Sequence, residues 1–383
     1  MNQRERVLTS LNHKEPDKIP YDLDGSNLTG IHWIAYRRLI SHLGIEEDQI
    51  FIRDPIQQLA NVHESVLKRL KVDIRGVYPN SPSKWKMKIE SDINGNKYFM
   101  CQYGIKWEMP KGGLYFDPVG YPLVEGSREE LNNYPFPNPS DLKRIEGLKL
   151  LAKKYHEDGF LVTMSYIGGG WFELPFWLRG FENFYCDLAG NPKYACYLMD
   201  KLLEMEIDYW DLVISELGEY INVVLTVNDL AGQEGPLISP FMYRKYIKPR
   251  QNKLYSFIKK KKSSTYIFFH CCGSVYDLIP DLIEVGVDIL NPVQVSAKKM
   301  DTKKLKKEFG NEITFWGGID TQRVIPYGNS REINDEVKKR IDDLAPGGGF
   351  IFAPVHNIQA DVPPENVISM WESLQMNGRY SKD

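Results

Sequence analysis

Cysteine is scarce in this chain, and its placement excludes whole classes of protein. There are five cysteines, an odd number, and two of them are adjacent: Cys101, Cys186, Cys196, Cys271 and Cys272. This pattern does not fit the disulfide framework of a small secreted domain. Uninterrupted runs of about 18 apolar residues are also missing, and no apolar core of signal-peptide length follows the polar first residues. We therefore expect a cytoplasmic protein with reduced thiols and no membrane contact.

A large net charge and several common motifs are lacking as well. The 48 Lys and Arg residues nearly balance the 51 Asp and Glu residues, so we expect no nucleic-acid partner. Neither GxSxG nor CxxC occurs, which argues against hydrolase and dithiol redox chemistry. The triple glycine at 168–170 has neither the GxGxxG spacing nor a Walker ending, so it is not a phosphate loop.

What the sequence does contain is an alternation of short apolar runs and longer helical segments. This alternation is typical of parallel strands joined by crossover helices. Eight strands are expected, which predicts a single (β/α)8 TIM barrel domain over residues 1–383: Ile19–Leu23, Asp73–Val77, Leu161–Ser165, Val223–Val227, Tyr266–Phe269, Asp288–Leu290, Ile313–Trp316 and Phe350–Ala353. The apolar period of Pro192–Leu217 predicts a long helix that contributes to the core.

One stretch interrupts the alternation. Residues 80–125 contain three runs with strand character, Trp85–Ile89, Lys97–Tyr103 and Ile105–Met109, with Asn94-Gly95 as a hairpin turn signal. We interpret this stretch as a small antiparallel β-hairpin insertion. It either covers the barrel mouth or decorates the surface.

Polar residues follow several of the expected strands, at the face where barrel enzymes build their active sites. His270 and Cys272 come directly after one strand and share one side of an extended segment, and imidazole and thiolate are ligands that suit zinc. Cys271 should point the other way and pack as a small apolar residue. A catalytic zinc needs a third protein ligand. His356, after the last strand, is the first choice, and the alternatives are Asp22, Asp24 and Glu173.

Other strand ends offer substrate and catalytic residues. Asn228, Asp229 and Gln233 follow Val223–Val227, and Asp229 acts either on substrate or only in loop hydrogen bonding. Trp171 and Phe172 follow the triple glycine and are expected to line a flat, apolar substrate pocket. For donation of a proton to the leaving group, the residues expected are Tyr166, Glu173 and Asp229.

Several segments together resemble the uroporphyrinogen decarboxylase superfamily. The opening Arg4-Glu5-Arg6-Val7-Leu8 through Asn12 to Pro20 resembles its N-terminal signature, and the likeness continues along the chain through Leu178–Glu182, Asn228–Tyr243, His270–Gly273, Gly317–Asp320 and Pro363–Asn366. The resemblance covers nearly the whole chain and implies a (β/α)8 barrel. Decarboxylases of the family carry arginines after the first strand, where this chain has Asp22 and Asp24; we expect these acids, as substrate-contacting residues, to repel a polyanionic porphyrinogen.

The pair His270-x-Cys272 instead resembles the corrinoid-dependent methyltransferase branch. The third ligand there is typically a cysteine where this chain has His356, and decarboxylases also have histidine at this position. The resemblance implies a zinc enzyme of the O-demethylase type that moves a methyl group from a methoxylated, aromatic compound to the cob(I)alamin of a corrinoid protein, acting as a monomer or homodimer. The alternatives are transfer from a methylcobamide to a thiol of the coenzyme M type, a uroporphyrinogen decarboxylase-like reaction, and non-catalytic binding of a corrinoid or tetrapyrrole.

Overall fold

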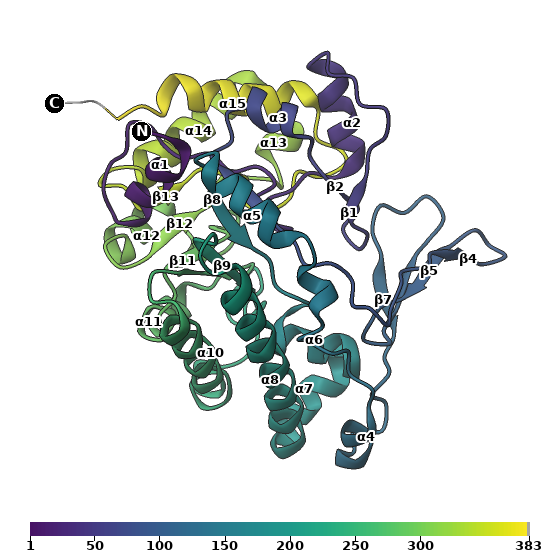
Figure 1. Ribbon diagram of the computed structural model, residues 1–383. Helices are drawn as coiled ribbons and strands as arrows, with labels where there is room; N and C mark the ends of the chain where they lie inside the picture. The colour runs from purple at the N-terminus through teal and green to yellow at the C-terminus, as the bar shows by residue number, and fades with distance from the viewer. Residues whose placement is uncertain (381–383) are drawn as a thin grey trace.

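The computed structural model describes residues 1–380 and contains a curved parallel sheet surrounded by helices (Figure 1). Seven strands are hydrogen-bonded in the order β13-β12-β11-β10-β9-β8-β3, so each strand lies beside the next one along the chain. Their bounds are β3 (Ile74–Val77), β8 (Leu161–Met164), β9 (Val223–Val227), β10 (Tyr266–His270), β11 (Ile289–Asn291), β12 (Thr314–Trp316) and β13 (Phe350–Ile351). The predicted (β/α)8 fold class is confirmed, and the strands fall at the predicted places.

The segment 19–23 closes the barrel, although it is not the regular strand that the sequence predicts. Tyr21 forms a single parallel bridge with Phe352, and the Asp22 N–H donates to the Phe352 carbonyl at 3.0 Å. On the other side, the Asp73 N–H donates to the Tyr21 carbonyl at 2.9 Å. Pro20 has no N–H to extend the pairing. The segment therefore touches both edges of the seven-stranded sheet through a few hydrogen bonds.

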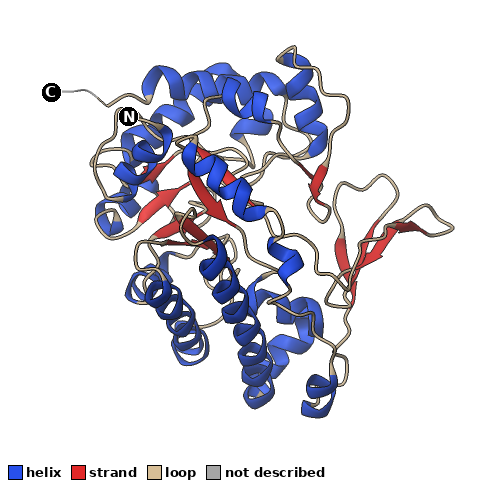
Figure 2. Cartoon of the chain, in the orientation of Figure 1, coloured by secondary structure: helices blue, strands red, loops and turns tan. Residues whose placement is uncertain are grey.

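Helices cover the outside of this barrel (Figure 2). The predicted helix over 192–217 is found with those bounds as α8. The helices are α1 (Gln3–Leu11), α2 (Trp33–His42), α3 (Glu64–Arg69), α4 (Arg128–Asn133), α5 (Leu148–Glu157), α6 (Gly170–Arg179), α7 (Phe181–Gly190), α8 (Pro192–Leu217), α9 (Pro240–Met242), α10 (Lys248–Lys261), α11 (Ile279–Glu284), α12 (Thr302–Phe309), α13 (Val324–Tyr327), α14 (Ser330–Leu344) and α15 (Pro364–Asn377). Within residues 1–380, none of them has the length and apolarity needed to cross a membrane.

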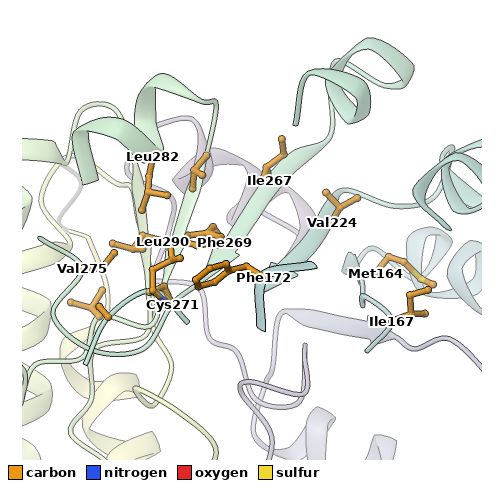
Figure 3. Close-up of a cluster of buried hydrophobic side chains, with 14 of the residues drawn as sticks. Met164, Ile167, Phe172, Val224, Ile267, Phe269, Cys271, Val275, Leu282 and Leu290 are labelled. Atoms are coloured by element: carbon orange, nitrogen blue, oxygen red, sulfur yellow. The ribbon is translucent and has the colours of Figure 1, made fainter. Parts of the chain in front are cut away.

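Alternate residues of the strands form two separate cores, inside and outside the barrel. Phe268 of β10 and Trp316 of β12 belong to the inner core, and their rings meet edge to face at 5.2 Å. Phe269 and Cys271 belong to the outer core, between the sheet and its helices (Figure 3). The period of two along β10 therefore directs His270 and Cys272 to the same side as Phe268.

The N-terminal signature has a structural role. The guanidinium of Arg6 in α1 pairs with Asp17 at 2.7 Å and with the buried Asp73 at 2.6 Å. The Asp73 carboxylate also accepts the Tyr21 N–H at 2.9 Å. One arginine thus ties α1 to the start of β3 and to the segment that closes the barrel.

The insertion is a four-stranded antiparallel sheet that projects beside the barrel in Figure 1. Its strands are β4 (Glu90–Ser91), β5 (Lys97–Met100), β6 (Lys106–Met109) and β7 (Asp117–Gly120). The turn at Asn94-Gly95 is confirmed, with Gly95 at a φ of +83°. The predicted strand Trp85–Ile89 is wrong: these residues have no regular secondary structure, and the Trp85 indole donates to the Met100 carbonyl at 3.1 Å. A further pair, β1 (Ile52–Asp54) and β2 (Leu59–Ala60), lies at the barrel mouth.

Candidate active site

Three side chains with metal-binding atoms converge at the carboxyl ends of the barrel strands. The nitrogen or sulfur atoms of His270, Cys272 and His356 all lie within 4.8 Å of one another. His270 is the last residue of β10, and Cys272 follows it with its Sγ 3.3 Å from His270 Nε2. His356 comes from the loop after β13, and its ring lies 5.4 Å from that of His270. The structure thus brings together the three residues that the sequence proposes as metal ligands.

Hydrogen bonding fixes which nitrogen of His270 faces the cluster. Asn291, beside His270 in β11, donates its Nδ2 to the Trp316 carbonyl at 2.8 Å. Its Oδ1 therefore faces His270 Nδ1 at 2.6 Å, and as an acceptor it requires Nδ1 to carry the proton. The lone pair of Nε2 is then free on the side of Cys272. An imidazole held in this way by a neighbouring acceptor is typical of a metal ligand.

The protonation states around the cluster are governed by burial. Burial lowers the pKa of His270 to about 4, and burial together with the neighbouring His270 lowers the pKa of His356 to about 4. Both imidazoles are therefore neutral near pH 7, the form that binds metals. Burial, with the charge of Asp229, raises the pKa of the Cys272 thiol well above its usual range. A thiolate here needs a cation beside it, and a His, Cys, His set is the donor chemistry of a zinc site.

The cluster opens into a cavity of about 780 Å³. His270 and His356 line one part of it, together with three residues that the sequence selects as catalytic, Tyr166, Glu173 and Asp229. The Asp229 carboxylate accepts the Cys272 N–H at 2.7 Å. Burial raises the pKa of Asp229, and burial plus the charge of Asp229 raises the pKa of Glu173 well above its usual range. Among residues 1–380, Glu173 has no hydrogen-bond partner, so its carboxyl group faces the cavity without a fixed role in the fold.

The acids of the first loop lie outside this cavity, against expectation. Asp22 is fully buried, and it accepts the Trp316 indole N–H at 2.9 Å and the Gly25 N–H at 2.9 Å. Asp24 pairs with Arg53 at 2.5 Å. Neither Asp22 nor Asp24 belongs to the metal-binding group found in residues 1–380. Asp22 and Asp24 are therefore not placed to repel a polyanionic substrate, because Arg53 and Arg144 line the cavity and the two acids do not.

The loop at 168–172 serves packing more than substrate contact. Gly170 has a φ of +75°, and a Cβ there would lie 2.0 Å from the Val227 carbonyl oxygen. This close approach lets Asn228 accept the Phe172 N–H at 2.8 Å. Trp171 and Phe172 are buried, and Phe172 points into the outer core in Figure 3, so neither lines the cavity. Asn228 is likewise buried, and Gln233 is exposed outside the cavity lining. The predicted flat pocket at Trp171 and Phe172 is therefore misplaced.

The aromatic wall of the cavity comes largely from the insertion, whose aromatic residues were not predicted as substrate-binding. Trp107 of β6 meets Trp177 of α6 edge to face at 5.2 Å, and Phe99 meets Phe116 at 5.0 Å. The aromatic side chains that line the cavity are Trp85, Phe99, Tyr103, Trp107, Tyr115, Phe116, Tyr166, Trp177 and Phe181. The insertion thus covers the barrel mouth. The one sequence signal for this wall is the density of aromatic residues within 85–116.

Comparison with known proteins gives both sequence and structural relatives. The family model described as "Uroporphyrinogen decarboxylase (URO-D)" matches residues 102–376. Curated uroporphyrinogen decarboxylases from Geobacter sulfurreducens and Geobacter metallireducens are 24% and 25% identical, each over 71% of this chain and 75% of the relative. A solved structure described as a methyltransferase from Methanosarcina mazei covers 98% of this chain and 99% of its own, with a TM-score of 0.64 and 17% identity. At that identity the likeness supports the fold and not the activity.

Proposed function

From the premise that this chain belongs to the uroporphyrinogen decarboxylase family, we propose that it is a zinc-dependent methyltransferase. It moves a methyl group from a methoxylated aromatic compound to the cob(I)alamin of a separate corrinoid protein. The observation that carries this proposal is the convergence of His270, Cys272 and His356 at the wall of a large aromatic cavity. A thiol beside two neutral imidazoles is a typical set of zinc ligands. A reaction without a metal would not require these three side chains to lie together.

Three protein residues would hold the metal. His270 binds through Nε2, because Asn291 holds its Nδ1 proton. Cys272 binds as the thiolate, and His356 is the third ligand. When bound, zinc supplies Lewis acidity at the ether oxygen and stabilises the phenolate that leaves. Three protein ligands are the number that a catalytic zinc typically takes from the protein.

The acids beside the cluster provide the proton that the leaving phenolate takes up. Glu173 is the proposed donor, because burial and the charge of Asp229 raise its pKa well above the usual range, which favours the protonated acid, and it has no structural hydrogen bond. Asp229 orients the Cys272 backbone and adds the negative charge that raises the Glu173 pKa. Tyr166, on the same wall, is the alternative donor.

Metal content of the purified protein tests the proposal directly. Near-stoichiometric zinc is expected in the wild type and a loss of most of it in Cys272→Ser and His356→Ala. Cys101→Ser is the matched control, because Cys101 also lines the cavity but lies outside the cluster. Absence of zinc from the wild type after reconstitution would refute the metal site.

Methyl transfer is then measured with methoxyaromatic compounds and cob(I)alamin, following the conversion to methylcobalamin by its absorbance. Transfer that requires zinc and is lost in Cys272→Ser supports the O-demethylase reaction. Transfer from methylcobalamin to a thiol in the same assay, without ether cleavage, would assign the reverse class of reaction.

The second candidate is a decarboxylase. It is favoured by the curated relatives, which are uroporphyrinogen decarboxylases, and by two arginines in the cavity lining. Release of CO₂ from a porphyrinogen by the zinc-free protein is the outcome that would favour it. The Cys272→Ser variant separates the two candidates, because a metal-free decarboxylation does not need the thiol.

A further inference from the structure

Arg144 is a buried cation in the cavity wall. It lies on the short 3-10 helix η1 (Leu142–Ile145), and only 1% of its surface is exposed. Its Nε donates to the Asn138 carbonyl at 3.0 Å, and its Nη2 donates to Gln102 Oε1 at 2.7 Å. Both acceptors are neutral. The one acid whose charge acts on it is Asp141, and that carboxylate is turned outward to Ser83.

The absence of an acidic partner sets Arg144 apart from the other buried arginines. Each of the others in residues 1–380 has a carboxylate within ion-pair distance: Arg6 with Asp17 and Asp73, Arg75 with Glu64, Arg179 with Asp187, and Arg340 with Glu336. Arg53, also in the cavity lining, is paired with Asp24. A guanidinium taken out of water without a counter-charge is costly. We expect an unpaired guanidinium at a cavity wall to bind an anionic group of a ligand.

We propose that Arg144 is the anion-binding residue of the cavity, and that the substrate carries a carboxylate that pairs with it. The inference deepens the proposed function, since it takes the same cavity as the substrate site. Arg144 has Gln102 and Tyr103 beside it in the lining, and the guanidinium retains donors beyond the two bonds that hold it. A planar guanidinium binds a carboxylate through paired hydrogen bonds.

The charge beside the metal-binding cluster sets the direction of binding. The Asp229 carboxylate lies beside the metal-binding cluster, where it accepts the Cys272 N–H at 2.7 Å, and its negative charge disfavours an anion there. The aromatic wall of Trp107 and Trp177 belongs to the same cavity. The substrate is therefore an aromatic methyl ether with its ether oxygen toward the cluster and its carboxylate at Arg144.

Binding of two matched probes tests this inference without any catalysis. The probes are 3-methoxybenzoate and its neutral isostere 3-methoxybenzamide, and their dissociation constants are measured by calorimetry and by quenching of the cavity tryptophans. The wild type is expected to bind the benzoate at least about tenfold more tightly than the amide. Equal affinity for the two probes, or binding of neither, overturns the proposal.

Variants then assign the preference to this residue. Arg144→Gln is expected to lose the preference while retaining affinity for the amide, and Arg144→Lys is expected to keep part of it. Arg323→Gln removes the same charge from an exposed position and should bind both probes as the wild type does. A preference that survives in Arg144→Gln overturns the proposal. If that variant does not fold, the wild-type comparison and Arg144→Lys still decide.

These measurements need neither zinc nor a corrinoid, so their failure is distinguishable from that of the proposed function. A protein that prefers the benzoate but transfers no methyl group keeps the anion site and loses the reaction. A protein that transfers methyl groups equally well from the benzoate and the amide keeps the reaction and loses the anion site.

Discussion

Replacing Asn291 tests whether the hydrogen bond behind His270 matters for metal binding. In Asn291→Leu, a side chain of similar volume can neither accept from His270 Nδ1 nor donate to the Trp316 carbonyl, bonds of 2.6 and 2.8 Å in the wild type. Loss of such a partner typically lowers metal affinity by about 10- to 100-fold, which is about 1.4 to 2.8 kcal/mol of binding free energy. The reason is that the imidazole then rotates freely and samples the wrong tautomer.

The zinc dissociation constant is measured by competition with a chelator of known affinity. The variant also leaves a buried carbonyl without its donor, so the free energy of unfolding of the metal-free protein should fall by about 1 to 3 kcal/mol. Asn366→Leu is the control, because the Asn366 amide donates to the Ile325 and Gly328 carbonyls at 2.8 and 3.0 Å, outside the cavity lining. A zinc affinity within twofold of the wild type in Asn291→Leu would refute the orienting role.

Three further predictions concern the acids and the N-terminal arginine. Glu173→Gln should lower kcat for methyl transfer by about 100-fold, with bound zinc unchanged, because the proton donor is removed; wild-type kcat in this variant would assign the proton to Tyr166. Burial raises the pKa of Glu206 to about 7 from an ordinary 4.5, so this group alone should remove about 3 kcal/mol of unfolding free energy as pH rises from 4.5 to 7. Glu206→Gln should flatten this part of the profile in denaturant titrations, and an unchanged slope would contradict the assignment. Arg6→Ala leaves Asp73 buried and unpaired and should cost about 3 kcal/mol or more, read as a lower thermal midpoint.

The metal-binding residues were predictable because they follow directly from strand position. An apolar run that ends in His270 fixes both the edge of the barrel and the side on which Cys272 lies, since side chains alternate along β10. His356 follows the strand that closes the barrel, which brings it to the same edge. The strands could be assigned from local sequence patterns alone. The barrel fold then brings their carboxyl ends to the same edge.

The substrate residues were not predictable in the same way. Asp22 and Asp24 lie in an irregular loop whose side-chain directions depend on distant partners, Trp316 and Arg53. Trp171 and Phe172 look available beside three glycines, but Gly170 packs against the Val227 carbonyl and turns them into the core. The prediction of a strand at 85–89 was wrong. The strand in this region is β4 at Glu90–Ser91, which begins after the apolar run has ended.

The origin of the cavity walls has a consequence for how this enzyme could change during evolution. The cluster of His270, Cys272 and His356 belongs to strand ends and loops of the barrel, whereas much of the aromatic wall belongs to one contiguous excursion of the chain between β3 and α4. Exchange of residues 80–125 between relatives would therefore alter which substrate is accepted and leave the reaction chemistry in place. The metal-binding cluster and the aromatic wall can diversify independently. The cluster is under selection for reactivity, and the wall is under selection for the substrate that is bound.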